Sequence, residues 1–163
     1  MLASLPSQVN ILLEILLALF FGGLIGFERE LVGKPAGLRT HMLAAASATL
    51  FIALGNYVVN DFDFPGFVRT DPIRIIQAII IGISFLGSGT IIQRDDGDYI
   101  AGLTTAASLL AAAGIGISVA LRQFIIAGGT TLIILVVNRA LGYIGHRIPD
   151  DSPPPPDHKH EET

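Results

Sequence analysis

The chain has 163 residues, of which 51% are hydrophobic and 15% charged, whereas soluble domains carry about 25% charged residues. This deficit, together with a mean hydropathy of +0.63, indicates an integral membrane protein. A net charge of −4 gives no basic surface for nucleic acid, and the lack of cysteine excludes disulfides, thiolate zinc sites and cysteine nucleophiles.

A membrane-spanning helix needs about 20 mostly apolar residues, and five apolar segments are long enough. In chain order they are residues 9–27, 38–59, 73–92, 100–120 and 123–144. We interpret the first as a span and not as a signal peptide, because its first charge is Glu14 and no basic residue precedes it. The segments lack the alternation of a membrane β-barrel, so strands are not expected. The predicted fold is an all-α, polytopic membrane helix bundle with about five transmembrane helices.

Residues 1–148 form the predicted transmembrane domain. Residues 149–163 are rich in proline and lack apolar residues that could seed a core, so we predict a disordered cytoplasmic tail. With five spans the two ends lie on opposite sides of the membrane. The side that holds the first connection and the tail carries the larger number of Lys and Arg residues. The positive-inside rule therefore places the N-terminus outside and the C-terminus in the cytoplasm.

Small residues recur within the predicted spans, and in lipid they allow helices to approach closely. Two interpretations stay open: a tightly packed bundle, or a pore or homodimer seam lined by some of the glycines. The predicted packing positions are Gly22, Gly26, Gly82, Gly87, Gly89 and Gly102.

A charged stretch separates the first two spans. Residues 28–30 (Glu-Arg-Glu) end the first span, and Arg39 and His41 begin the second. The short connection brings these helix ends together, so either glutamate can pair with Arg39, whereas His41 has no evident partner. Residues 34–37 (Lys-Pro-Ala-Gly) predict the turn, with Gly37 allowing a positive φ. The stretch is either a plain interfacial loop or a functional site.

Other ionisable residues lie near the membrane. Glu14 falls about 7–8 Å into the first span, where such residues are functional candidates. Asp71 and Pro72 predict the N-cap and first position of the third helix. Arg74 opposes the helix dipole there, so we expect a carboxylate partner such as Asp71 or Glu14. Residues 95–98 (Asp-Asp-Gly-Asp) are either oxygen ligands for Mg²⁺ or Ca²⁺ or a solvated turn.

Sequence motifs of known catalytic machinery are missing. The sequence shows no nucleophile–base–acid set, no P-loop and no dinucleotide fingerprint. We therefore predict that the chain is not an enzyme and needs no cofactor.

Three motifs resemble those of the MgtC/SapB family, in the same order and spacing. They are residues 22–30 (GGLIGFERE) with 34–41 (KPAGLRTH), residues 71–75 (DPIRI) with 82–89 (GISFLGSG), and residues 102–108 (GLTTAAS). The resemblance covers about residues 9–144.

This resemblance implies a bacterial inner-membrane protein with about five spans, associated with growth in low Mg²⁺ and survival inside host cells. It also implies restraint of the F-type ATP synthase as one activity within the family. The charged motif residues it marks as functional are Glu28, Arg29, Glu30, Arg39, Asp71 and Arg74. We add Thr40, His41, Thr104 and Thr105, polar residues of the same motifs, as further candidates. A Pro-rich tail stands where MgtC itself carries a soluble domain, so the chain resembles the short SapB-type members.

Two functions are then expected. The first is a non-enzymatic membrane regulator linked to Mg²⁺ homeostasis, which can be homo-oligomeric and binds another membrane protein such as the ATP synthase. The second is a transporter or channel for a divalent cation or another small solute, whose route runs past the Glu28/Arg39 and Asp71/Arg74 clusters.

Overall fold

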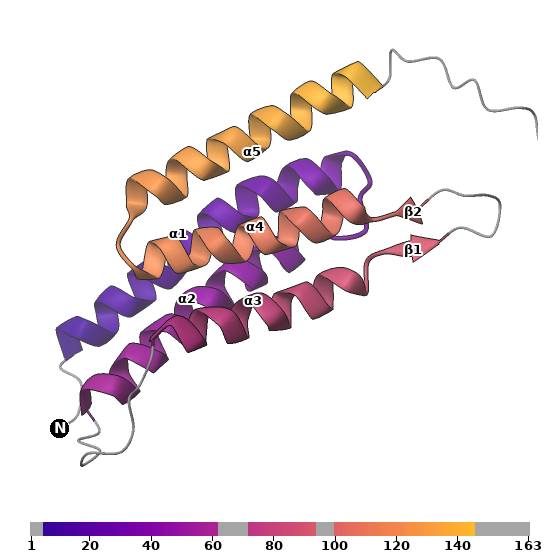
Figure 1. Ribbon diagram of the computed structural model, residues 1–163. Coiled ribbons are helices and arrows are strands. Elements are labelled where there is room, and N and C mark those ends of the chain that lie inside the picture. Colours follow the sequence, from indigo (N-terminus) through magenta and orange to yellow (C-terminus); the bar gives the residue numbers. More distant parts are fainter. Residues whose placement is uncertain (1–4, 62–71, 94–99, 146–163) are drawn as a thin grey trace, which may run out of the picture.

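The computed structural model describes residues 5–61, 72–93 and 100–145. Its elements are α1 (Leu5–Leu31), α2 (Leu38–Asp61), α3 (Pro72–Ser88), β1 (Ile92–Gln93), β2 (Ile100–Ala101), α4 (Leu103–Ala120) and α5 (Phe124–Gly145). The five helices lie alongside one another in a bundle (Figure 1). The predicted all-α fold class is confirmed, whereas the predicted tail lies outside the described residues.

A short antiparallel ribbon between α3 and α4 was not expected from the sequence. Ile92 faces Ala101 and Gln93 faces Ile100 across its two strands. The predicted spans 73–92 and 100–120 were therefore too long at this end of the bundle, because α3 ends at Ser88 and α4 begins at Leu103.

Glycine explains where α4 begins. Gly102 has a φ of 92°, in the left-handed region that favours glycine. A Cβ atom at this position would also collide with the carbonyl oxygen of Thr90. Any other residue would be strained here, so Gly102 fixes the turn from the ribbon into α4.

The core is made largely of small side chains. Fully buried alanines include Ala18, Ala45, Ala112, Ala113 and Ala127. Such residues let helix backbones approach closely, which is how helices associate without a hydrophobic driving force between them. α4 lies in the middle of the bundle and contacts the other four helices.

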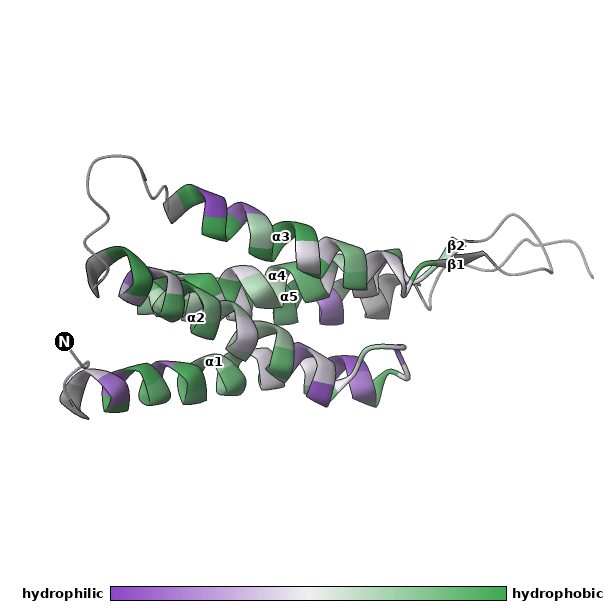
Figure 2. Cartoon of the chain, turned by 90° about the horizontal axis from the view of Figure 1, so that it is seen from below, coloured by the Kyte–Doolittle hydropathy of each residue, from purple (hydrophilic) through white to green (hydrophobic). Residues whose placement is uncertain are grey.

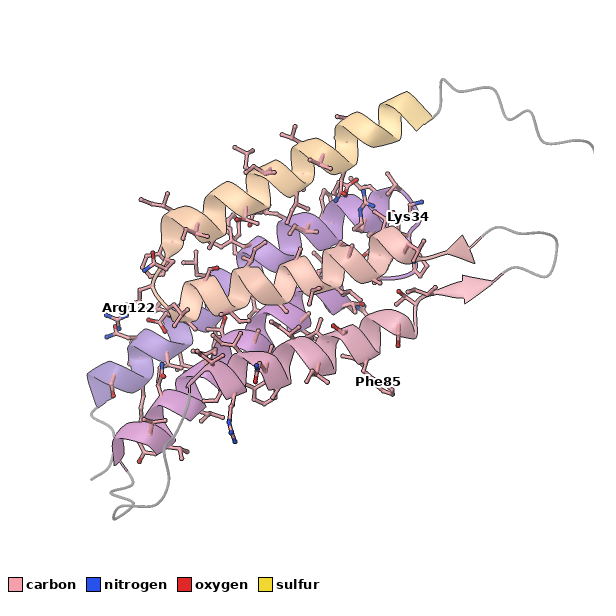
Figure 3. The ribbon with its side chains drawn as sticks, in the orientation of Figure 1. Lys34, Phe85 and Arg122 are labelled. Atoms are coloured by element: carbon pink, nitrogen blue, oxygen red, sulfur yellow. The ribbon has the colours of Figure 1, made fainter. Side chains whose placement is uncertain are left out.

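The outer surface is apolar between the helix ends. Ile125 is 92% exposed and Phe85 is 78% exposed, and Phe85 points away from the other helices (Figure 3). Hydrophilic residues gather toward the ends of the helices (Figure 2). Large exposed apolar surfaces mark contact with a membrane or a protein partner.

Three of the described helices contain segments long and apolar enough to cross a membrane, namely residues 7–31, 38–59 and 103–120. α3 and α5 contribute shorter apolar segments, residues 73–88 and 124–140. Together with the apolar exterior, these helices indicate a multi-pass membrane protein.

Candidate functional site

The first part of the candidate site is a buried ion pair at the end of α1. Arg29 donates from Nε to Oε2 of Glu28 over 2.6 Å and from Nη2 to Oε1 over 2.7 Å. Both side chains are buried. Asn138 of α5 donates from Nδ2 to Oε2 of the same glutamate over 3.1 Å. One carboxylate therefore joins α1 to α5 through two residues that lie 110 positions apart in the chain.

The connection from α1 to α2 is held by the other glutamate. The Glu30 carboxylate accepts a hydrogen bond from the backbone N–H of Leu38 over 2.8 Å, which satisfies an orphan donor at the start of α2. The positive φ of this turn occurs at Gly33, with a value of 64°, and not at Gly37. A Cβ at Gly37 would lie 2.6 Å from Oε2 of Glu30, so the Glu30 carboxylate would have to move if position 37 carried a side chain.

His41 forms the second part of the site and is fully buried. Its Nδ1 lies 2.9 Å from the carbonyl oxygen of Gly37, and its Nε2 lies 2.9 Å from Oγ of Ser108 on α4. A carbonyl only accepts, so Nδ1 carries a hydrogen. In neutral His41, Nε2 therefore accepts the hydroxyl hydrogen of Ser108.

The Ser108 hydroxyl has two acceptors within reach but only one hydrogen. Its Oγ also lies 2.9 Å from the carbonyl oxygen of Thr105. When Ser108 donates its hydrogen to the Thr105 carbonyl, Nε2 of His41 keeps a hydrogen bond only if that nitrogen is protonated and donates to Oγ of Ser108. Thr105 is buried, whereas its neighbour Thr104 is exposed, so of the two predicted threonines only Thr105 belongs to this hydrogen-bonded chain.

Glycines bring these groups together. A Cβ atom at Gly22 would lie 2.5 Å from the carbonyl oxygen of His41, and one at Gly26 would lie 2.7 Å from that of Gly37. A Cβ at Gly116 of α4 would collide with the carbonyl of Ala45. We call the contact of α1, α2 and α4 around Gly22, Gly26 and Gly116 the glycine seam.

The other predicted packing glycines differ in their surroundings. A Cβ at Gly87 would lie 3.4 Å from Ala106. Gly82 would meet no atom within 4 Å, and Gly89 would meet only Leu86 of its own helix end. The packing role expected for Gly82 and Gly89 therefore has no counterpart between helices of this chain.

Arg39 does not pair with Glu28 or Glu30, and Arg74 does not pair with Glu14. Within the part of the chain that the structure describes, neither side chain forms an ion pair. Glu28 binds Arg29 in place of Arg39, and Glu14 binds Arg122 over 3.1 Å in place of Arg74. Asp71, the other expected partner of Arg74, lies outside the described residues.

Both arginines instead line a groove between α2 and α3. Its volume is about 910 Å³, and Leu109 of α4 is also in its wall. The predicted residue Thr40 lies at the same end as Arg39, and the remaining lining is mostly aliphatic. The described ranges contain no cluster of three or more His, Cys, Asp or Glu side chains able to hold a metal. The acidic residues 95–98 fall outside those ranges.

Sequence reasoning missed three partners. Ser108, Asn138 and Arg122 each bind an ionisable residue that lies 67 or more positions away. Ser108 follows Thr105 by one helical turn within the GLTTAAS motif, which was a usable signal. Asn138 could also have been noticed, because a polar side chain in an apolar helix is itself a sign of a buried partner.

Comparison with known proteins agrees with the motifs. The model of the MgtC family matches residues 15–147. Protein MgtC of Salmonella typhimurium is 40% identical over 137 residues, which cover 84% of this chain and 54% of the relative. Protein SapB of Bacillus subtilis is 34% identical over 153 residues, covering 93% of this chain and 65% of the relative.

A third relative carries a functional name. The putative magnesium transporter YhiD of Escherichia coli is 35% identical over 135 residues, covering 81% of this chain and 62% of the relative. The chain thus spans between about half and two thirds of the length of these curated relatives. No solved structure matches. The predicted resemblance is confirmed, and the chain belongs to the MgtC family.

Proposed function

We propose that this chain is a non-enzymatic regulator in the bacterial inner membrane, linked to magnesium limitation, that acts by binding another membrane protein. The N-terminus then lies outside and the C-terminus in the cytoplasm, which places the Glu28–His41 stretch on the cytoplasmic side. The family and the names of its relatives support the link to magnesium.

One observation carries the choice of a regulator. The carboxylates of the charged stretch are already bound to protein groups: Glu28 to Arg29 and Asn138, and Glu30 to the start of α2. A divalent cation needs several oxygen ligands. These carboxylates hold helices together, which provides the fixed scaffold that a binding protein needs. Neither of them lines the groove between α2 and α3.

A transporter is the second candidate, favoured by the name of the Escherichia coli relative. Its route for a divalent cation would have to avoid the α2–α3 groove. The two guanidinium groups of Arg39 and Arg74 line that groove with mostly aliphatic neighbours, and their positive charge repels a cation. A cation route past Glu28 would follow a different path through the bundle, and it would be narrower than the groove or open only transiently.

Purification and flux measurements separate the two functions. The chain, solubilised in mild detergent from cells grown in low Mg²⁺, is expected to retain a membrane protein through a high-salt wash. An unrelated membrane bait of similar size should not retain it. Subunits of the ATP synthase, the partner expected from the resemblance, are among the proteins to look for by mass spectrometry.

Proteoliposomes provide the opposing result. A regulator should give no more Mg²⁺ entry into dye-loaded vesicles than empty liposomes do. Mg²⁺ entry that is present in the natural chain, lost in Glu28→Gln and kept in Lys34→Gln would overturn the proposed regulator. Lys34 is a suitable control because it is exposed at the same end of the bundle (Figure 3).

A further inference from the structure

The α2–α3 groove is large for a bundle packed through small residues. Its volume of about 910 Å³ falls in the range of about 300–1,000 Å³ that is typical of small-molecule sites. Its apolar lining includes Leu43 and Phe51 of α2 and Ile79 and Ile83 of α3. Such sites combine an apolar lining with a few polar groups that fix orientation.

The charged groups among the lining residues of this groove are both cationic. Arg39 and Arg74 are both exposed and line it, and neither forms an ion pair within the described residues. Nothing acidic is among the lining residues that the structure describes. An occupant that complements this surface has an apolar body and a negative charge.

The two arginines lie at opposite ends of the groove. α2 and α3 are joined at the Asp61–Pro72 side and run in opposite directions, so Arg39, in the first turn of α2, and Arg74, in the first turn of α3, are far apart. At the Arg39 end, the neighbouring residue Thr40 adds a hydroxyl donor to the guanidinium, whereas Ser47, the other hydroxyl residue in the lining, lies further along α2. A phosphate accepts hydrogen bonds from both kinds of group.

The length of the groove fits one acyl chain. Positions 39 and 51 of α2, both of which line it, lie about 18 Å apart at about 1.5 Å per residue. One leaflet of the hydrocarbon core is about 15 Å thick, half of the about 30 Å of the bilayer. A chain that starts at the interface beside Arg39 therefore reaches the middle of the membrane within the groove.

We propose that the α2–α3 groove binds one anionic phospholipid, with its phosphate on Arg39 and Thr40 and an acyl chain along the aliphatic wall. Basic pockets between transmembrane helices are a recurring way to hold such headgroups. This lipid site does not depend on whether the chain is a regulator or a transporter.

Native mass spectrometry of the delipidated full chain tests the site, with phosphatidylglycerol and phosphatidylcholine as probes. We expect one phosphatidylglycerol to bind at least about tenfold more tightly than phosphatidylcholine, and Arg39→Gln to remove that preference. Lys34→Gln, which removes a charge at the same end outside the groove, should leave it intact. Equal binding of both lipids, or an unchanged preference in Arg39→Gln, would overturn the proposal.

A second pair of variants tests the acyl chain. Gly82→Leu fills the groove, since Gly82 lines it and a Cβ there meets nothing within 4 Å. Gly129→Leu adds the same side chain in open space on α5, away from the groove. The first should weaken phosphatidylglycerol binding and the second should not. If Arg74→Gln, and not Arg39→Gln, removes the preference, the assigned headgroup position is wrong.

Discussion

The two sides of α2 are packed in opposite ways. Toward α1 and α4, the glycine seam brings backbones into contact, and Thr49 donates to the carbonyl of Gly116 over 2.8 Å. Toward α3 lies the groove of about 910 Å³, where a Cβ added at Gly82 would meet no atom within 4 Å. Glycine thus has two roles in this bundle: it allows close approach of helices in the seam and leaves space in the groove.

This difference separates structural from binding roles. Polar groups of the seam are buried and satisfied, because an unpaired polar group in lipid is costly. The two arginines of the groove are exposed, and neither forms an ion pair within the described residues, which leaves them accessible to a ligand. The four substitutions below are ordered by the size of the expected effect on the free energy of unfolding.

The largest effect is expected at the buried ion pair near the end of α1. Arg29→Met leaves the buried carboxylate of Glu28 with Asn138 as its remaining partner, and breaking a buried pair costs about 3–5 kcal/mol. The loss of unfolding free energy is measured by titrating the detergent-solubilised protein with SDS while circular dichroism monitors the helix content. The double variant Glu28→Gln/Arg29→Met removes both charges and should recover much of it. A double variant less stable than Arg29→Met would contradict the pairing.

A smaller loss is expected from one methyl group in the seam. Gly116→Ala places a Cβ against the carbonyl of Ala45, which is backbone and cannot rotate away. Overpacking of this kind costs about 1–3 kcal/mol. Gly114→Ala, two residues earlier on the same helix, meets nothing within 4 Å and is the matched control. Equal stabilities of the two variants in the same SDS titration would show that α2 and α4 do not touch here.

The fold was largely predictable from the sequence, for a physical reason. Five long apolar segments can satisfy their backbones in lipid only as helices, so their number and order follow from composition. The ends of the third and fourth spans could not be predicted in this way, because Ile91 and Ile100 are as apolar as the helices they adjoin. The left-handed turn at Gly102 sets where α4 begins, and hydropathy does not register it.

The candidate site was predictable in its location but not in its pairing. Glu28, Arg29 and His41 were recognised because charge inside an apolar sequence is costly. Glu28 or Glu30 was expected to pair with Arg39 across the turn, yet Glu28 binds its own neighbour Arg29. Ser108 comes from a distant helix, and no local pattern shows which of several serines in a helix faces a histidine.

The third prediction concerns that histidine. Ser108→Ala leaves Nε2 of buried His41 without its partner, which costs about 1–3 kcal/mol for an unsatisfied buried group. Ser118→Ala removes a hydroxyl of the same helix that bonds only to the Gly114 carbonyl and should change stability far less. Thermal unfolding in detergent compares them. Similar melting temperatures for the two variants would mean that the His41–Ser108 bond does not hold α2 to α4.

The smallest effect has the opposite sign and contrasts the two sides of α2 most directly. Gly82→Ala adds a methyl group where nothing lies within 4 Å, so it gains helix propensity without a clash. Alanine is favoured over glycine in a helix by about 0.8–1.0 kcal/mol, so this variant should unfold at a higher SDS fraction than the natural chain. The same Gly-to-Ala change therefore destabilises at position 116 and stabilises at position 82. If Gly82→Ala is destabilising by as much as Gly116→Ala, α3 packs tightly on α2 in the membrane and the groove is closed there.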